Sequence, residues 1–279
     1  MARDPLTFRS LLFTPANRPE RFARAASSGA DGAILDLEDG VGLPHKQEAR
    51  QAALAFLAAP VVTPARFAWG LRLNHITTVD GLRDLLTLSE SQTRPDLIML
   101  PKVEQSAEVE IVVRHLGPIP VVAMIETGRS LATADTIAAH PAVAALAFGG
   151  ADLAADLGAV LDWESMLFAR ARIVQAAAVA HHPVFDVPFL DIQDIDGLQR
   201  ETEAAKRLGY TCKMAIHPAQ IAPINAAFAP TAAELDRAQR IVAAFTNAHG
   251  GACQLDGRMI DAPVVKAAQR TVQLAASSN

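Results

Sequence analysis

The chain has 279 residues, 51% of them apolar and 20% charged, and a net charge of −5 at pH 7. This composition predicts a soluble globular protein with one large core and excludes a disordered chain. The acidic balance without a basic block excludes a nucleic-acid-binding surface, and no apolar stretch is long enough to span a membrane. Arg3 and Asp4 precede a short apolar run that we interpret as a strand and not as a signal peptide, so we expect a cytoplasmic protein.

Eight apolar runs of strand length, each followed by polar residues, succeed one another along the chain. The runs are Ser10–Pro15, Gly32–Asp39, Ala68–Asn74, Leu97–Val103, Val121–Thr127, Ala144–Gly150, Pro183–Leu190 and Cys212–Pro218. Most are separated by segments with apolar residues three or four positions apart, and Gly209 is expected to end one such helix. This alternation predicts an α/β fold, the (β/α)8 TIM barrel, whose active site lies at the carboxyl ends of the strands.

The pattern changes after the eighth run, so we divide the chain into a barrel, residues 1–229, and a C-terminal helical extension, residues 230–279. Thr231 and Glu234 have the spacing of a capping box, which predicts the start of a helix. A flexible glycine-rich segment and a last helix, from Pro263 to about Leu274, are expected to follow. We interpret the extension as a lid over the barrel mouth; packing against the barrel floor is the alternative.

The direction of side chains along the strands places charged groups inside the barrel. In the second run, Ile34, Asp36 and Glu38 share one face, and the leucines between them share the other. The same alternation places Arg72 and Asn74 on one face of the third strand, and Met124 and Glu126 on one face of the fifth. Buried charges of this kind are costly without a ligand or a metal, so the sequence predicts a functional site at this rim.

Two carboxylates at neighbouring strand ends indicate a metal site. Glu126 and Asp152 follow the fifth and sixth strands, so their oxygens can converge on one cation. Two carboxylates completed by water or substrate favour Mg²⁺, with Mn²⁺ as a substitute, over zinc, which prefers His or Cys. The alternative is that Glu126 forms a buried structural ion pair with Arg72.

Seven motifs at the ends of the expected strands resemble the citrate lyase beta-subunit-like family of the HpcH/HpaI aldolase superfamily. They span residues 9–17, 35–39, 71–74, 100–104, 125–127, 148–153 and 216–218, and read RSLLFTPAN, LDLED, LRLN, LPKVE, IET, FGGADL and IHP. The extension adds Asp256-Gly-Arg-Met-Ile-Asp-Ala-Pro263, which is similar to the lid motif of malyl-CoA and citramalyl-CoA lyases. The resemblance covers nearly the whole chain.

The resemblance implies a magnesium-dependent oxo-acid lyase that cleaves a 3-hydroxyacyl-CoA thioester into an acyl-CoA and an oxo-acid. Mg²⁺ on Glu126 and Asp152 would polarise the substrate oxygens, and Arg72 would bind the same oxygens through its several N–H donors. Asp261 would exchange a proton with the acyl-CoA carbon. In this family the lid often covers a neighbouring subunit, so a homo-oligomer, a trimer or hexamer, is expected.

Six further residues have supporting roles by resemblance, and each has an alternative. Asp36, Glu38 and Asp39 would orient metal-bound water and substrate, with Glu38 the first choice as a catalytic group; Asp39 faces away by alternation. The residues assigned to coenzyme A are Phe13, Arg18 and Lys46, although Arg18 precedes Pro19 at a helix start and is equally compatible with a solvated position. His217 is interpreted as structural, and Lys102 is not expected to form a Schiff base.

Other functions stay open at this point. The chain would be a citrate lyase beta subunit if its substrate were a citryl group on an acyl carrier protein, or a binding barrel without turnover. A class II pyruvate aldolase shares the metal pair but is expected to have a histidine near the second strand, where this chain has Glu38 and Asp39. The motifs do not distinguish malyl, citramalyl, methylmalyl and citryl substrates or exclude thioesterase activity.

Overall fold

The computed structural model describes residues 8–59, 64 and 67–277, so Arg3 and Asp4 lie outside the described residues. The chain forms two compact units, Met1–Asn225 and Ala226–Asn279. No helix in the described ranges combines the length and the apolar character needed to cross a membrane. Neither cysteine forms a disulfide within the described residues; Cys212 is buried and Cys253 is half-buried.

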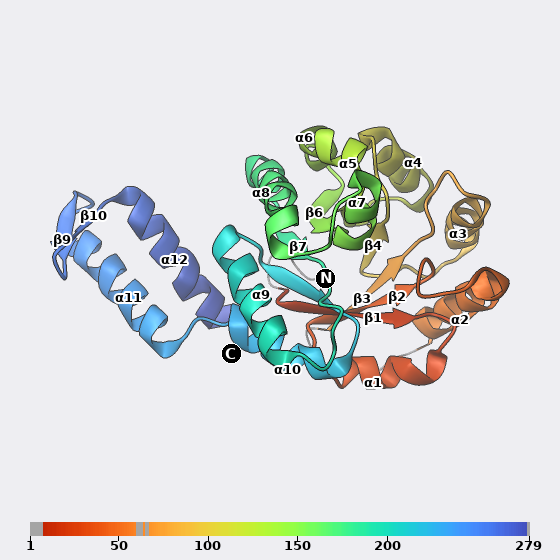
Figure 1. The fold of residues 1–279 in the computed structure, drawn as a ribbon, viewed down its shortest axis with the longest axis horizontal. Helices are drawn as coiled ribbons and strands as arrows, with labels where there is room; N and C mark the ends of the chain where they lie inside the picture. Colours follow the sequence, from red (N-terminus) through yellow and green to blue (C-terminus); the bar gives the residue numbers. More distant parts are fainter. Residues whose placement is uncertain (1–7, 60–63, 65–66, 278–279) are drawn as a thin grey trace. The chain divides into compact units, whose positions relative to one another are not determined.

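The first unit is a closed barrel of eight parallel strands, which confirms the predicted TIM-barrel fold (Figure 1). The strands are β1 (Ser10–Pro15), β2 (Gly32–Asp36), β3 (Ala68–Arg72), β4 (Leu97–Leu100), β5 (Val121–Ile125), β6 (Val143–Phe148), β7 (Val184–Asp186) and β8 (Cys212–Ala215). They pair in sequence order, and β8 closes the barrel by pairing with β1. Closure brings the eight carboxyl ends to one rim.

Most strands end two or more residues earlier than their apolar runs. The second run was expected to continue to Asp39, but β2 ends at Asp36. The physical reason lies in Asp36 itself, whose carboxylate accepts the backbone N–H groups of Glu38 and Gly40, both at 2.9 Å. These bonds turn the chain out of the sheet. Glu38 therefore lies in the loop beyond the strand.

Helices surround the barrel. They are α1 (Phe22–Ala26), α2 (Lys46–Ala58), α3 (Val79–Glu90), α4 (Ser106–Leu116), α5 (Gly128–Ala132), α6 (Ala134–Ala138), α7 (Gly150–Leu157), α8 (Trp163–Val179), α9 (Ile195–Leu208) and α10 (Ile221–Phe228), with short 3-10 turns at Pro19–Arg21, Leu43–His45 and Pro218–Gln220. Local sequence sets their ends: Asp194 caps the first turn of α9, and Gly209, with φ of 120°, follows its last residue, as predicted.

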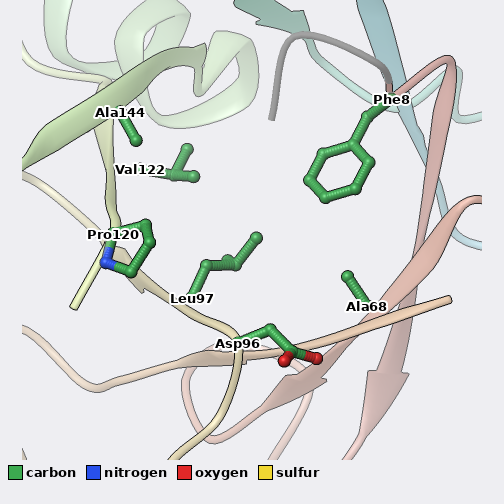
Figure 2. A pocket seen from close by; sticks show the side chains of 7 residues that line it. All are labelled: Phe8, Ala68, Asp96, Leu97, Pro120, Val122 and Ala144. Carbon is green, nitrogen blue, oxygen red and sulfur yellow. The ribbon is translucent and has the colours of Figure 1, made fainter. Parts of the chain in front are cut away.

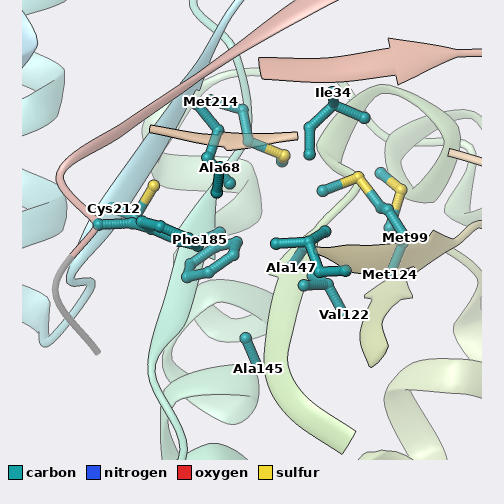
Figure 3. Packing of buried hydrophobic residues seen from close by; sticks show 13 residues of the cluster. Ile34, Ala68, Met99, Val122, Met124, Ala145, Ala147, Phe185, Cys212 and Met214 are labelled. Atoms are coloured by element: carbon teal, nitrogen blue, oxygen red, sulfur yellow. The ribbon is translucent and has the colours of Figure 1, made fainter. Parts of the chain in front are cut away.

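The barrel interior is an apolar core that includes Ile34, Met124, Phe185 and Met214 (Figure 3). Ile34 and Met124 lie on the faces that the alternation predicted to point inward. Near the amino ends of the strands, a cavity of about 10 Å³ is lined by Phe8, Ala68, Asp96, Leu97, Pro120, Val122 and Ala144 (Figure 2). A volume of this size holds a water molecule at most, so this end of the barrel is a packed floor.

The second unit contains α11 (Ala232–Asn247), β9 (Cys253–Leu255), β10 (Arg258–Ile260) and α12 (Ala262–Ser277). Thr231 and Glu234 form the predicted capping box at the start of α11. The expectation of a flexible glycine-rich segment was wrong, because β9 and β10 form a hairpin. Asp256 and Gly257 both have positive φ, 52° and 74°, as a tight two-residue hairpin turn requires. Apolar side chains of both helices and both strands form the core of this unit.

A group of buried charges lies outside the barrel core, between β7, β8 and helices α8 and α9. Lys213 Nζ donates to Asp186 at 2.6 Å and to Glu201 at 2.7 Å, and Arg170 also pairs with Asp186. Arg170, Asp186 and Lys213 are at most 1% exposed. Two cations and two carboxylates balance one another here, so the group is closed and structural.

Replacing Asp186 by Ala leaves Lys213 and Arg170 with one buried carboxylate fewer. We expect the free energy of unfolding to fall by about 3–5 kcal/mol, the usual cost of breaking a buried pair on one side. Urea unfolding followed by circular dichroism measures this loss. Asp135→Ala is the control, because its pair with Arg172 is partly exposed and is worth less than about 1 kcal/mol. A similar, small loss in both variants would contradict the structural role of Asp186.

Candidate active site

The charged residues predicted from the strand ends gather at the carboxyl rim of the barrel. Asp36 ends β2, and Glu38 follows in the loop; Arg72 ends β3. Glu126 follows β5, and Asp152 lies in the first turn of α7, just after β6. The carboxyl rim is where TIM barrels place their catalytic groups.

Arg72 is held in place by a two-pronged contact with Asp36. Its Nε and Nη2 donate to the two carboxylate oxygens at 2.8 and 2.7 Å, and its guanidinium lies over the Phe13 ring, 4.7 Å from the centroid. Burial favours a raised pKa for Asp36, but Arg72 and the two backbone N–H groups outweigh it, and the pKa is lowered. Asp36 is therefore a buried support for Arg72, and protein donors occupy both of its oxygens.

Glu38 lies against the other side of Arg72. Its Oε2 is 3.0 Å from Arg72 Nη1, yet this buried oxygen makes no hydrogen bond within the described part of the chain. Its Oε1 accepts a hydrogen bond from Lys102 Nζ at 2.8 Å. Burial raises the pKa of Glu38 despite the two cations. Glu38 is thus a buried ion-pair partner of both Arg72 and Lys102.

Glu126 is the most deeply buried carboxylate at the rim, with 1% exposed. Its Oε1 accepts the backbone N–H of Lys102 at 2.6 Å, and its own backbone N–H donates to Ser130 Oγ at 3.0 Å. Burial, and next the charge of Glu38, raise the pKa of Glu126 to about 8. A Cβ on Gly149 would overlap the carboxylate, so only glycine fits beside it. The predicted alternative, a Glu126–Arg72 ion pair, does not form; the ion pairs found for Arg72 go to Asp36 and Glu38.

Asp152 and Glu126 fit a divalent metal by the chemistry of their oxygens. Asp152 is partly exposed, with 41% of its side chain accessible, and its charge contributes to the raised pKa of Glu126. Within the described residues no group of three His, Cys, Asp or Glu side chains is arranged as a metal-binding set. The chain therefore offers two carboxylates, one buried and one open to solvent, a set typical of Mg²⁺ with water or substrate completing the shell.

The residues assigned to coenzyme A lie in different places. Lys46 is buried, and its ammonium donates to the carbonyl oxygens of Leu37 and Glu38 at 2.7 and 2.6 Å, contacts that fix the loop after β2. Its length lets it reach back along α2 to the loop after β2. Arg18 is exposed beside a 3-10 turn, as its alternative reading allowed.

A cavity of about 260 Å³ lies between β1, α1 and the turn after β8. Phe13 lines it, and its basic lining residues are Arg21 and Arg24, which the motif comparison did not single out. His217 also lines it, and its ring accepts the backbone N–H of Ala219 at 3.2 Å. Arg21 and Arg24 follow Pro19 in the sequence and are three residues apart, a spacing that places two side chains on one face of a helix. This spacing was the signal in the sequence that could have identified them.

Lys102 was considered only as a Schiff-base residue, and the structure places it within the site. Its Nζ lies 2.8 Å from Glu38, 3.7 Å from Asp152 and 3.9 Å from Asp39, whose side chain is exposed. A basic residue at the carboxyl end of β4 was the signal in the sequence. Asp261, in the second unit, precedes α12, where its Oδ1 accepts the Val264 N–H at 3.4 Å.

Comparison with known proteins identifies the family of the chain. Residues 9–218 match the model described as HpcH/HpaI aldolase/citrate lyase. The chain belongs to this family. Residues 165–277 also match a model described as C-C bond lyase of the TIM-barrel fold. The resemblance inferred from the strand-end motifs is confirmed.

Relatives with assigned names match nearly the whole chain. The citrate lyase subunit beta-like protein of Mycobacterium tuberculosis is 36% identical over 95% of this chain and 94% of its own. The (3S)-malyl-CoA thioesterase of Cereibacter sphaeroides is 34% identical over 98% and 96%. The human mitochondrial citramalyl-CoA lyase is 32% identical over 96% and 86%. A solved structure of CitE from M. tuberculosis, in complex with magnesium, acetoacetate and coenzyme A, is 35% identical with a TM-score of 0.82, covering 96% of this chain and 97% of that one.

The raised pKa of Glu126 predicts a pH-dependent stability when divalent metal is removed. Between its ordinary value of 4.5 and about 8, the folded protein keeps a proton on Glu126 that the unfolded chain releases. Raising the pH through this range therefore lowers the free energy of unfolding, by up to about 1.4 kcal/mol per pH unit, and the effect levels off above about pH 8.

Thermal unfolding from pH 5 to 9 with chelator measures this effect in the wild type and in Glu126→Gln. The glutamine is neutral throughout, so its melting temperature should fall less steeply with pH than that of the wild type. Parallel pH profiles for the two proteins would show that Glu126 does not bind the proton.

Proposed function

We propose that the protein is a magnesium-dependent carbon–carbon lyase that cleaves a 3-hydroxy-dicarboxylyl-CoA thioester, of the malyl-CoA or citramalyl-CoA type, into an acyl-CoA and an oxo-acid. The observation that carries this proposal is the pair Glu126 and Asp152 beside Arg72 at the carboxyl rim of a barrel of this family. Relatives named as a citramalyl-CoA lyase, and one structure with magnesium and coenzyme A, support it.

Glu126 and Asp152 would hold the metal. When bound, Mg²⁺ supplies Lewis-acid stabilisation of negative charge on the hydroxyl oxygen that becomes the new carbonyl. The buried Glu126 gives up its proton on metal binding, and the more exposed Asp152 leaves the outer side open to water and substrate. Gly149 keeps the space beside Glu126 clear.

Arg72 binds and orients the substrate carboxylate or hydroxyl oxygen. Asp36 takes its Nε and one N–H of Nη2, so the guanidinium enters the reaction with a fixed plane and with further N–H groups to donate. A donor fixed before the reaction stabilises charge in the transition state without reorganising. Glu38, held between Arg72 and Lys102, accepts a proton or orients a water at its Oε2.

The coenzyme occupies the cavity between β1, α1 and the turn after β8. Arg21 and Arg24 supply positive charge for its phosphates, and Phe13 supplies an apolar ring close to Arg72. This assignment keeps Phe13, replaces Lys46 and gives Arg18 at most an outer contact. It also places the thioester end of the coenzyme toward the rim where Glu126 and Arg72 lie.

Asp261 returns a proton to the carbon of the acyl-CoA after the carbon–carbon bond breaks. The electrons of that bond pass to the thioester, whose enolate then takes the proton, while the substrate hydroxyl loses its own proton and becomes the oxo-acid carbonyl. We assign Asp261 to a lid formed by the extension, residues 230–279, acting on a neighbouring subunit of a cytoplasmic homo-oligomer, a trimer or a hexamer.

A thioesterase activity is the second candidate, because one relative is named a (3S)-malyl-CoA thioesterase. The same metal and arginine would bind the malyl group, and water would attack the thioester in place of carbon–carbon cleavage. The two activities release different products, an oxo-acid in one case and a free hydroxy-acid with coenzyme A in the other.

Malyl-CoA, citramalyl-CoA, 3-methylmalyl-CoA and citryl-CoA form the panel that tests the lyase. We expect release of an oxo-acid from at least one of them with Mg²⁺ and its loss with chelator. Asp152→Asn should lower kcat by at least about 100-fold, because the metal loses one of two protein ligands. Asp156→Asn makes the same change one turn further along α7 and should retain activity.

Product analysis separates the outcomes. Free thiol without oxo-acid indicates the thioesterase. An inactive panel together with cleavage of a citryl group on an acyl carrier protein would replace the acyl-CoA proposal by a citrate lyase beta subunit. Equal activity of Asp152→Asn and the wild type would remove the metal mechanism.

Asp261→Asn tests the proton transfer. An amide cannot exchange this proton, so we expect loss of deuterium incorporation into the acyl-CoA product in deuterated water, with substrate affinity changed by less than about threefold. Mass spectrometry of acetyl-CoA or propionyl-CoA incubated with enzyme, Mg²⁺ and an oxo-acid measures the exchange. Asp256→Asn in the hairpin turn is the matched control. Normal exchange in Asp261→Asn would assign the proton to another group.

A further inference from the structure

Lys102 has a backbone conformation that is uncommon for its residue type. It follows β4 with φ of 51°, in the left-handed region that favours glycine. In this conformation its backbone N–H points at Glu126 Oε1, 2.6 Å away. A short bond to a buried carboxylate offsets the unfavourable backbone, and strained residues of this kind gather at functional sites.

The side chain of the same residue contacts the opposite part of the site. Its ammonium donates to Glu38 Oε1 at 2.8 Å and lies 3.7 Å from Asp152 Oδ1 and 3.9 Å from Asp39 Oδ2. About one-third of the side chain, 32%, is exposed. One residue just after β4 thus connects the loop after β2, the end of β5 and the first turn of α7.

We propose that Lys102 is a positioning residue of the lyase, which holds Glu126 through its backbone N–H and Glu38 through its ammonium. The proposal rests on the lyase function given above. In this proposal Lys102 acts through two other side chains. It keeps Glu126 directed at the metal, and it keeps Glu38 directed at Arg72 and the substrate.

The contacts of the amine are those of a positioning group. Its hydrogen bond goes to Glu38, and Asp39 and Asp152 are within 4 Å of it. A fixed positive charge beside Asp152 also repels a second cation, which gives the proposal a consequence for metal affinity.

Lys102→Met, Lys102→Arg and Lys102→Gly change the side-chain contact with Glu38 and retain the backbone N–H that binds Glu126. Methionine keeps the length without the charge, arginine keeps the charge, and glycine keeps the backbone N–H in a conformation it adopts readily. Lys266→Met, on the exposed side of α12, is the control for loss of one lysine charge. Mn²⁺ binding is measured by electron paramagnetic resonance without substrate, and kcat and KM are measured on the active panel member.

In Lys102→Met and Lys102→Gly we expect Mn²⁺ to bind about 2- to 5-fold more tightly, because a repelling charge is gone. We expect kcat to fall about 10- to 100-fold with KM within about threefold, because Glu38 loses a charge-assisted hydrogen bond. Lys102→Arg should restore part of kcat, and Lys266→Met should match the wild type. Tighter metal with slower turnover is a combination that general damage to the site does not produce.

Three results would overturn the proposal. The first is that the wild type is active and that Lys102→Met has the same kcat as the wild type. The second is weaker Mn²⁺ binding together with lost turnover that arginine does not restore, which indicates general damage. The third is a wild type that binds Mn²⁺ without cleaving the panel, with the same Mn²⁺ affinity in Lys102→Met. A wild type that neither binds Mn²⁺ nor cleaves any substrate removes the lyase function and this inference with it.

Discussion

The contact between Arg72 and Asp36 is the interaction on which the site depends. It joins the ends of the paired strands β2 and β3 by two hydrogen bonds of 2.7–2.8 Å, and both partners are less than 10% exposed. An arginine buried to this extent without a carboxylate would be strongly unfavourable. With it, the guanidinium plane is fixed, Glu38 is directed along its other edge, and Asp36 turns the chain out of β2 by accepting two backbone N–H groups.

Helix α2 supports this arrangement from outside the barrel. Lys46 and Arg50, one turn apart and both buried, face two successive loops of the rim. Lys46 donates to the carbonyl oxygen of Glu38, and Arg50 donates to Asp84, whose other oxygen accepts both N–H donors of Asn74, the backbone and the side-chain amide. A helix that closes a β/α unit thus also fixes the loops after β2 and β3, and Lys46, which follows the acidic motif, contributes to this through its contacts with Leu37 and Glu38.

The barrel and the position of Glu126 and Asp152 at its rim were predictable because they depend on local patterns. The alternation of side chains along the strands predicted that Ile34 and Met124 point inward. The polar residues that follow the apolar runs predicted Glu126 and Asp152 at the rim. Long side chains were less predictable. Lys102 and Lys46 reach partners outside their own element, which no spacing encodes. The hairpin at residues 253–260 has a recognisable Asp-Gly turn, but strands of three residues are too short to show alternation.

The balance of charge differs between the candidate active site and the structural group of buried charges in this barrel. In the buried group of Arg170, Lys213, Asp186 and Glu201, two cations meet two carboxylates, and every charge is compensated within the protein. At the rim, carboxylates outnumber the cations Arg72 and Lys102. The rim carboxylates are Asp36, Glu38, Asp39, Glu126 and Asp152. Burial, and next the charge of Glu38, raise the pKa of Glu126 to about 8, so its carboxylate favours either a proton or a cation. An excess of carboxylates over cations at buried positions is costly unless a cation or a proton compensates it, and this cost supports the proposed metal site independently of the motifs.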